Sequence, residues 1–310
     1  MISDTGQHPR WHVGFVGFAY PEWNGTFYPT GLPARDRLAY VSRKVNAVEI
    51  NTSFYAVPDA AIVRRWAETT PPEFRFCLKM IRDVTHGPTP AGSLASSSGP
   101  PPGHFELEST REAAARLLRS AAPLSDRLGA VLLQFPPVFR ADRHAELLAF
   151  LHNLPRLATL AVEFRHSSWR DPAILNEYAA IGVTIVARDD TPHTRIGGAP
   201  SDLWAEHHSM FASGNLLYLR WLGRHGQFPD RTRERVDPTP HINWWLERIR
   251  EALAANPQIR DVFIFLDNDF AGHAPTTARR LCEMLHLAPC GAQAEDAAPR
   301  SLFDHLEGAS

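Results

Sequence analysis

Acidic, basic and amide side chains recur at the carboxyl ends of short apolar segments in this chain, and these groups transfer protons and bind anions. The segment Val48-Glu49-Ile50-Asn51 shows the pattern clearly, because its acid and its amide alternate with aliphatic residues. Successive side chains of a strand point to opposite faces, so Glu49 and Asn51 share one face. We predict that this face is turned toward a functional site.

Later apolar segments carry polar side chains on the face opposite their aliphatic residues. These side chains are Lys79, Gln134, Glu163, Arg165, Tyr218 and Arg220, and Asp267-Asn268-Asp269 follows the last segment. Glu163 and Arg165 share a face but are separated by about 6.6 Å along a strand. We therefore expect each of them to pair with a residue from another strand.

The apolar segments that carry these residues read as eight strands separated by helices. Strands are expected at 12–17, 46–51, 74–80, 129–135, 160–164, 182–187, 216–221 and 262–266. Helices are expected at 37–45, 59–68, 109–122, 142–153, 171–180, 241–254 and 274–287, with only a short or broken helix at 200–211. Regular alternation implies parallel strands, because each return crossing needs a helix, and eight units favour closure into a barrel. An open doubly wound sheet would favour a GxGxxG turn, which the sequence lacks.

The predicted fold class is α/β, a single-domain TIM-like (β/α)8 barrel over 12–287, with a flexible leader at 1–11 and a tail at 288–310. A Pro/Gly/Ser-rich insertion at 87–108 follows the third strand on the rim where barrel active sites lie, and it reads either as disorder or as a mobile lid. Ser109, with Glu112 three residues later, predicts a capping box at the start of the next helix.

Composition and charge exclude several classes of protein. The 310 residues are 44% hydrophobic and 21% charged, as in a soluble globular protein, and a formal net charge of −2 gives no global basic field for nucleic acid. Cys77, Cys282 and Cys290 lack CxxC spacing, which argues against a disulfide framework or structural zinc and favours a reducing cytoplasm. The polar start of the chain and the lack of a run of about 18 apolar residues predict neither export nor membrane insertion.

Six segments together resemble the YecE-like family, a bacterial and archaeal family of unknown function. They are GFAYPEW at 17–23, GTFYP at 25–29, VEINTSFY at 48–55, FRFCLK at 74–79, LQFPP at 133–137 and VEFRH at 162–166. The likeness runs from about residue 12 to 287 and includes Thr85, His86 and Trp169. It implies a TIM-like barrel and no established reaction, with endonuclease IV-like barrels as the usual comparison. The insertion at 87–108 is longer than is common in the family.

Barrel enzymes carry catalytic groups at the carboxyl ends of their strands, so the catalytic candidates are Glu49, Lys79 and Glu163. The substrate-binding candidates are Asn51, Tyr55, His86, Gln134, Arg165, Tyr218, Arg220, Arg224, Asn268, Gly272 and His273. The same charges could instead form a buried ion-pair network that serves only the fold.

Three chemistries remain open for these groups. A metal-dependent phosphodiesterase would need several ligands, and no metal is assigned because the candidates show no diagnostic spacing. Those candidates are Glu49, His86, Glu163, Asp189, Asp190, Asp267, Asp269 and His273. A metal-free lyase or isomerase would use Glu49 and Glu163 for proton transfer, or Lys79 as a Schiff base. A non-catalytic module would only bind an anionic ligand.

An anion site is predicted between Arg220, Arg224 and the backbone at Gly272-His273, where cations would face the first turn of the last helix. The sequence favours an enzyme, hydrolase- or phosphodiesterase-like, that acts at the barrel mouth on a small anionic, phosphate-bearing ligand. A divalent metal as cofactor and nucleic acid as partner stay open, and no membrane partner is expected.

Overall fold

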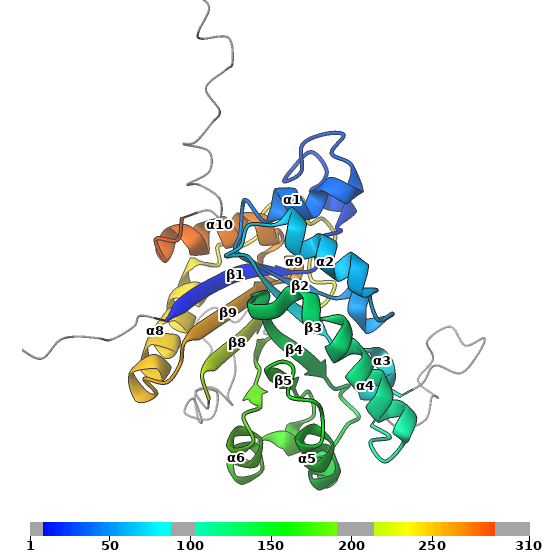
Figure 1. Cartoon of the computed structure of the whole chain (residues 1–310). Coiled ribbons are helices and arrows are strands. Elements are labelled where there is room, and N and C mark those ends of the chain that lie inside the picture. The colour runs from blue at the N-terminus through cyan, green and yellow to red at the C-terminus, as the bar shows by residue number, and fades with distance from the viewer. Residues whose placement is uncertain (1–8, 88–102, 191–213, 289–310) are drawn as a thin grey trace, which may run out of the picture.

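The computed structural model describes residues 9–87, 103–190 and 214–288. Within them, parallel strands form one nine-stranded sheet in the order β6-β5-β4-β3-β2-β1-β9-β8-β7. The strands are β1 (Arg10–Val16), β2 (Ala47–Ile50), β3 (Arg75–Lys79), β4 (Leu128–Gln134), β5 (Leu160–Glu163), β6 (Thr184–Ile185), β7 (Ala187–Asp189), β8 (Leu216–Trp221) and β9 (Asp261–Leu266). The sheet curls into a nearly closed barrel with helices around it (Figure 1), which confirms the predicted fold class.

Four predicted features lie wholly or largely outside the described residues. They are the leader, most of the insertion at 87–108, the short helix at 200–211 and the tail. The last residues of the insertion are described, and there Phe105 is buried against Phe139 and Phe150. This end of the insertion therefore belongs to the packed structure.

The seam of the barrel lies within the predicted sixth strand. The segment expected at 182–187 forms two short strands, β6 and β7, on either side of Val186. β6 pairs with β5 whereas β7 pairs with β8, so the chain itself joins the two ends of the sheet. The Val186 amide still donates to the Val162 carbonyl at 2.9 Å. Because this segment changes its partner strand at Val186, it counts as two strands, and the sheet has nine strands where eight were predicted.

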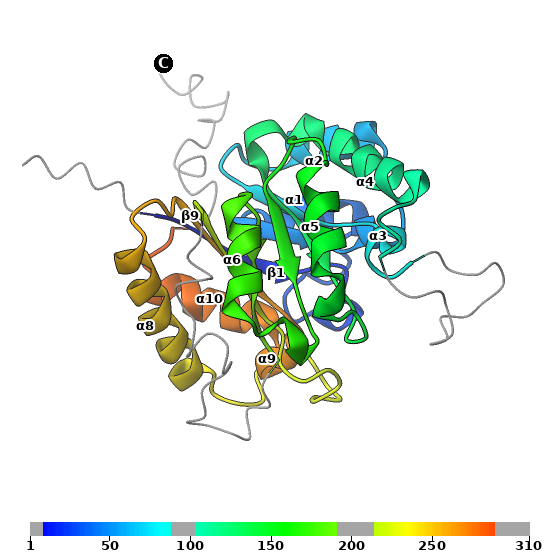
Figure 2. The same cartoon turned by 90° about the horizontal axis from the view of Figure 1, so that it is seen from below.

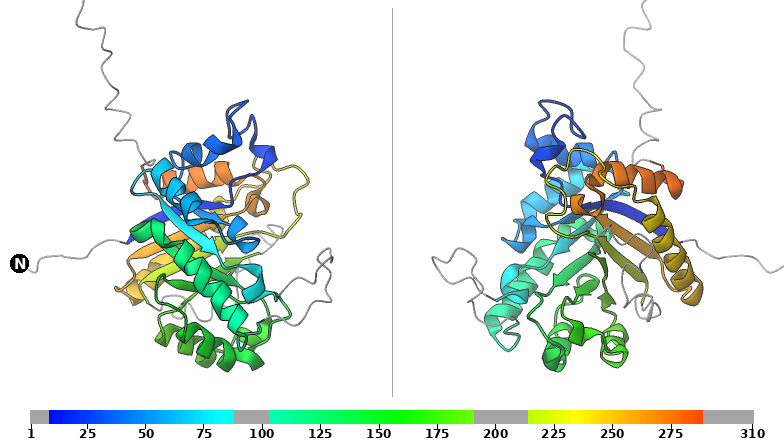
Figure 3. Two further views of the ribbon diagram at one scale, coloured as in Figure 1. Left: turned by 45° about the vertical axis from the view of Figure 1, so that its right-hand side comes forward. Right: turned by 180° about the vertical axis from the view of Figure 1, so that it is seen from behind.

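Helices cover the outside of the sheet (Figure 1, Figure 2 and Figure 3). The longer ones are α1 (Arg37–Val41), α2 (Ala60–Thr69), α4 (Glu108–Ser120), α5 (His144–His152), α6 (Pro172–Ala180), α8 (Thr239–Ala255) and α10 (Ala274–Met284). The short helices α3 (Arg82–Thr85) and α9 (Asn268–Ala271), which the sequence did not predict, follow β3 and β9. In the described ranges, none of the helices has both the length and the apolar character that a bilayer crossing requires.

Side-chain capping explains the start of some helices and not of others. Asp59 caps α2, since its carboxylate accepts a hydrogen bond from the Ala61 amide at 2.7 Å. The capping box predicted at Ser109 is wrong. Leu107 occupies the cap position and α4 begins at Glu108, so Ser109 already lies within the first turn.

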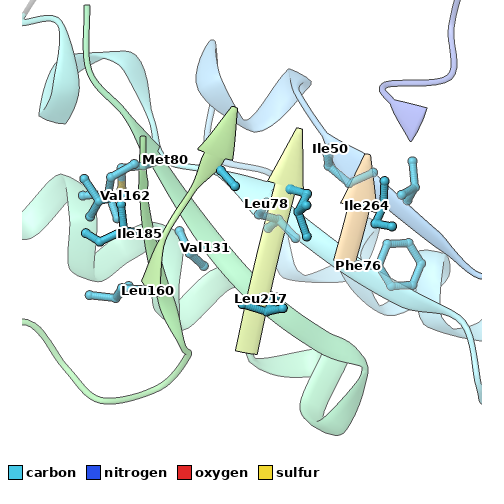
Figure 4. Close-up of a cluster of buried hydrophobic side chains, with 14 of the residues drawn as sticks. Ile50, Phe76, Leu78, Met80, Val131, Leu160, Val162, Ile185, Leu217 and Ile264 are labelled. Carbon is cyan, nitrogen blue, oxygen red and sulfur yellow. The ribbon is translucent and has the colours of Figure 1, made fainter. Parts of the chain in front are cut away.

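Two apolar layers confirm that strand alternation decides which side chains face inward. The outer layer packs between the strands and the helices and includes Phe76, Leu78 and Val162 (Figure 4). The inner layer fills the barrel and consists of Val16, Ala47, Cys77, Ala130, Leu132, Ala161, Val186, Leu216, Tyr218, Phe263 and Phe265. Cys77 and Leu78 are neighbours in β3 and belong to different layers, as the alternation predicts.

Gly14 lies in β1 where that strand meets β2, and an added Cβ would lie 2.2 Å from the Ala47 carbonyl oxygen. We expect Gly14→Ala to lower the free energy of unfolding by about 3 kcal/mol, because the backbone of a central strand must move. Urea denaturation measures this loss.

Gly31→Ala is the control for Gly14→Ala. No atom of the described residues lies within 4 Å of its added Cβ, so only the strain of a φ of 83° remains, about 1 kcal/mol. A loss at Gly14 no larger than the loss at Gly31 would contradict the close approach of β1 to β2.

Candidate functional site

The buried guanidinium of Arg220, on β8, is the centre of a polar cluster at the carboxyl end of the barrel. Its Nε and Nη2 donate to the two carboxylate oxygens of Glu49 at 2.9 and 2.8 Å. Its Nη1 donates to Glu163 and also to the Gln134 amide oxygen, the latter at 3.3 Å. Both glutamates are 0% exposed and Arg220 is 2% exposed. These are charge-assisted hydrogen bonds, the strong class in proteins.

Tyr218 and Lys79 complete this cluster. The Tyr218 hydroxyl donates to Glu49 Oε2 at 2.9 Å, and Lys79 Nζ donates to the Gln134 amide oxygen at 3.0 Å. Side chains from β2, β3, β4, β5 and β8 therefore converge in one hydrogen-bonded group. The predicted inward orientation of these residues is confirmed.

Two arginines lie at the outer edge of the cluster, beside Glu163. Arg165 Nε donates to Glu163 Oε1 at 2.9 Å. Arg188, on β7, places Nη1 3.9 Å from the same oxygen and Nη2 2.9 Å from Asp190. The prediction that Arg165 pairs with another strand is wrong. β5 ends at Glu163, so the strand spacing that would separate the two side chains no longer applies at Arg165.

Neighbouring positive charge keeps Glu163 in its anionic form. Burial alone would raise its pKa, but the guanidinium groups of Arg220, Arg165 and Arg188 outweigh burial and lower the pKa to about 2. At neutral pH this carboxylate accepts hydrogen bonds and has no proton to donate. The arrangement therefore disfavours the predicted use of Glu49 and Glu163 as a proton-transfer pair.

Lys79 has a different electrostatic environment. Burial, and then the positive charge of Arg220, lowers its pKa to about 8. Its Nζ lies 4.2 Å from the centroid of the Phe54 ring, which packs edge-on against His86 at 5.1 Å between centroids. Burial and the charge of Lys79 lower the pKa of His86 to about 4, so its imidazole is neutral at neutral pH. Lys79 and His86 therefore contact the same aromatic ring.

The remaining candidates that follow β2 lie at the rim. Asn51 lies beside Gly17, and Tyr55 is 79% exposed with its ring against Phe54. Neither side chain has a hydrogen bond to the Arg220 cluster among the described residues. Their predicted roles in substrate binding stay predictions.

The residues that follow β9 hold the loops together. Asp267 caps α9 by accepting a hydrogen bond from the Asp269 amide at 3.0 Å. The Asn268 amide oxygen accepts from Trp23 Nε1 and from the Ala274 amide, both at 3.0 Å. The amide oxygen of Asn268, predicted to bind substrate, is therefore occupied by structural hydrogen bonds, whereas its buried Nδ2 has no hydrogen-bond partner among the described residues.

The structure does not bring together the predicted anion site of Arg220, Arg224 and Gly272-His273. Arg220 is already paired with two carboxylates, and Arg224 is exposed on the loop after β8. A Cβ on Gly272 would lie 2.6 Å from Arg235 Cγ, so this backbone is covered. His273 lines a cavity of about 810 Å³ between α1 and α10, on the outer side of β1. The prediction failed because the loop after β8 packs over α9.

The candidate metal ligands are dispersed. Among residues 9–87, 103–190 and 214–288, no three His, Cys, Asp or Glu side chains form a group that could hold a metal ion. Asp189 accepts from Trp245 Nε1 at 2.7 Å, and Asp269 accepts from Arg231 at 3.1 Å. The described part of the chain therefore offers no ready ligand set for a metal centre.

Arg188 and the position of Phe54 beside Lys79 were not predicted. The expected sixth strand ended at 187, one residue before Arg188, whose inward orientation the alternation from Val186 would have indicated. No local pattern could place Phe54, because its ring reaches Lys79 from the turn that follows β2.

The fold and the buried cluster define a (β/α)8 barrel protein with a charged carboxyl end. The chain belongs to the family described as protein of unknown function DUF72, whose sequence model matches residues 12–301. It is 28% identical over 155 residues to UPF0759 protein YecE of Escherichia coli K12, which is 50% of this chain and about half, 48%, of that relative. It is 25% identical over 316 residues to UPF0759 protein YunF of Bacillus subtilis, covering 94% of this chain and 98% of YunF.

Solved structures agree with the barrel. A DUF72 family protein of Thermotoga maritima has a TM-score of 0.64 at 23% identity, over 90% of this chain and 100% of that chain. One from Enterococcus faecalis has a TM-score of 0.65 at 20% identity, over 90% and 96%. D-psicose 3-epimerase, solved in the presence of D-fructose, has a TM-score of 0.50 at 12% identity, over 90% and 100%. At these identities the likeness shows the fold alone.

Glu163→Gln tests whether the cluster stabilises the fold. The change leaves the buried Arg220 with one carboxylate fewer, so we expect the free energy of unfolding in urea at neutral pH to fall by about 3–5 kcal/mol. Glu247→Gln, at an exposed position of α8, is the control and should stay within about 0.5 kcal/mol of the wild type. Equal losses in the two variants would show that this ion pair does not stabilise the protein.

Proposed function

We propose that the protein is an enzyme that binds a small anionic, phosphate-bearing ligand at the carboxyl end of the barrel and moves a proton through Lys79. The observation that supports this proposal is that the buried charges of the cluster are paired with one another, whereas those at its edge are partly exposed. Arg220 is occupied by two buried carboxylates, Glu49 and Glu163. Arg165 and Arg188 then lie at the partly exposed edge, where the charge of Arg165 helps to lower the pKa of Lys79 to about 8.

Arg165 and Arg188 supply the chemistry for anion binding. Their side chains are 31% and 21% exposed, and both approach the same oxygen of Glu163. A guanidinium has five N–H donors, and for Arg165 only Nε–H has a partner among the described residues. The remaining donors form a planar fork that suits phosphate or carboxylate oxygens.

Lys79 supplies the proton-transfer group. Acid–base catalysis is most effective when the pKa of the group lies near the working pH, and the pKa of Lys79 is about 8. Its hydrogen bond to Gln134 fixes the position of Nζ, and the Phe54 ring covers it on another side. The neutral imidazole of His86, against the same ring, is a proton acceptor within the same group of side chains.

Other chemistries fit the cluster less well. A lyase or isomerase that used Glu49 and Glu163 as acid and base would have to break their bonds to Arg220 first. A metal-dependent phosphodiesterase would need ligands that the described residues do not gather. A non-catalytic binding protein would keep the anion site without proton transfer, so turnover of a bound ligand separates that alternative from an enzyme.

Calorimetric titration with inorganic phosphate tests the anion site. We expect the wild type to bind phosphate and Arg165→Gln to bind about tenfold or more weakly, because charge-assisted hydrogen bonds are lost. Arg250→Gln, at an exposed position of α8, is the matched control and should bind as the wild type does. Circular dichroism of each variant verifies that it is folded.

Two results would contradict the anion site. The first is a wild-type protein that does not bind phosphate. The second is an equal affinity for phosphate in Arg165→Gln and Arg250→Gln. A short oligonucleotide titrated in parallel distinguishes the ligand class, because a nucleic-acid site would bind it more tightly than phosphate and with a steep dependence on salt.

A further inference from the structure

Lysine is almost absent from this chain. The 32 basic residues counted as Lys and Arg include only two lysines, Lys44 and Lys79. Lys44 is exposed in the turn after α1, whereas Lys79 ends β3 inside the barrel-mouth cluster. Arginine stays charged in proteins, so it cannot serve as an amine nucleophile. Lys79 therefore supplies an amine whose chemistry the surrounding arginines cannot provide.

The contacts of Lys79 suit an amine that loses its proton. Its Nζ contacts a neutral amide oxygen on Gln134 at 3.0 Å and an aromatic face on Phe54 at 4.2 Å. Within the described residues it makes no ion pair with a carboxylate. The three arginines of the cluster each form one: Arg165, Arg188 and Arg220.

The charges that face Lys79 come from several strands. Burial and Arg220 favour the neutral amine, Glu49 and Glu163 oppose this effect, and Arg165 adds to it, with a resulting pKa of about 8. A useful fraction of the side chain is therefore an uncharged amine near neutral pH.

We infer that Lys79 is a nucleophile that forms an imine with the carbonyl group of an anionic aldehyde or ketone. This inference rests on the proposed function, because Arg165 and Arg188 hold the phosphate or carboxylate of the ligand while its carbonyl carbon meets Nζ. It narrows the substrate to carbonyl compounds with an anionic group. It narrows the reaction to lyase or isomerase chemistry, in which an imine withdraws electrons from the neighbouring carbon.

The bond-making step balances without a further reactant. The lone pair of Lys79 Nζ attacks the carbonyl carbon, and the oxygen takes one of the two amine protons to give a carbinolamine. The second amine proton leaves with that oxygen as water, and a C=N double bond replaces the C–O bond. His86, whose imidazole is neutral, packs against the same Phe54 ring.

Borohydride trapping on the full chain tests this inference. Pyridoxal 5′-phosphate, an aldehyde that carries a phosphate, serves as the probe. It is incubated with the protein at about pH 7.5, any imine is reduced with sodium borohydride, and labelled peptides are identified by mass spectrometry. We expect Lys79 to be labelled about tenfold or more faster than Lys44, since one pKa unit changes the neutral fraction tenfold. Inorganic phosphate should slow labelling at Lys79 and leave Lys44 unaffected.

Lys44 is the internal control, and Lys79→Arg is the second variant. Lys79→Arg keeps a positive charge, so it should still bind phosphate in the calorimeter while losing the rapidly formed adduct. Labelling of Lys79 no faster than Lys44, or an equally rapid adduct in Lys79→Arg, would overturn the imine inference. Failure of trapping in a protein that still binds phosphate refutes the imine alone. Failure of the wild type to bind phosphate refutes the anion site.

Discussion

The carboxyl end of this barrel depends on one buried guanidinium. A charge removed from water is tolerated only where opposite charges and hydrogen-bond partners surround it. Arg220 meets this condition with Glu49 from β2, Gln134 from β4 and Glu163 from β5. None of these strands is a hydrogen-bonded neighbour of β8, so the contacts cross the barrel interior and tie its walls together. Removal of one of these side chains would leave a buried charge in the cluster without its partner.

The same constraint separates structural groups from reactive groups. The two glutamates are enclosed at the mouth and are hydrogen-bonded to Arg220, and the lowered pKa of Glu163 keeps that carboxylate anionic. Arg165 gains its position by pairing with the outer oxygen of Glu163. Lys79 is held by Gln134, which also accepts from Arg220, so the buried pair orients the lysine through a shared amide. The positive charge of Arg165 and the titratable amine of Lys79 therefore lie at the edge of a cluster whose buried charges are already paired.

The sequence was sufficient to predict the barrel and its inward-facing residues, because a two-residue alternation is a local property of each strand. It was not sufficient to predict which side chains form ion pairs, because those contacts depend on where each strand ends. Arg165 pairs within its own segment because β5 stops at Glu163. Arg188 was missed because the sixth strand was expected to end at 187, whereas β7 continues to Asp189. The predicted site at Gly272 failed because Arg235, far away in sequence, packs over it.

Carbon-13 NMR titration of the Glu163 carboxyl group is the most direct test of the claim that the guanidinium cluster fixes this acid as an anion. Its resonance can be assigned by its absence in Glu163→Gln. Because the surrounding guanidinium groups outweigh burial, we expect a pKa of about 2, and hence no titration as the pH falls from neutrality through the ordinary value of 4.5. A carboxyl resonance that titrates at or above 4.5 would show that the guanidinium groups do not hold Glu163 as an anion.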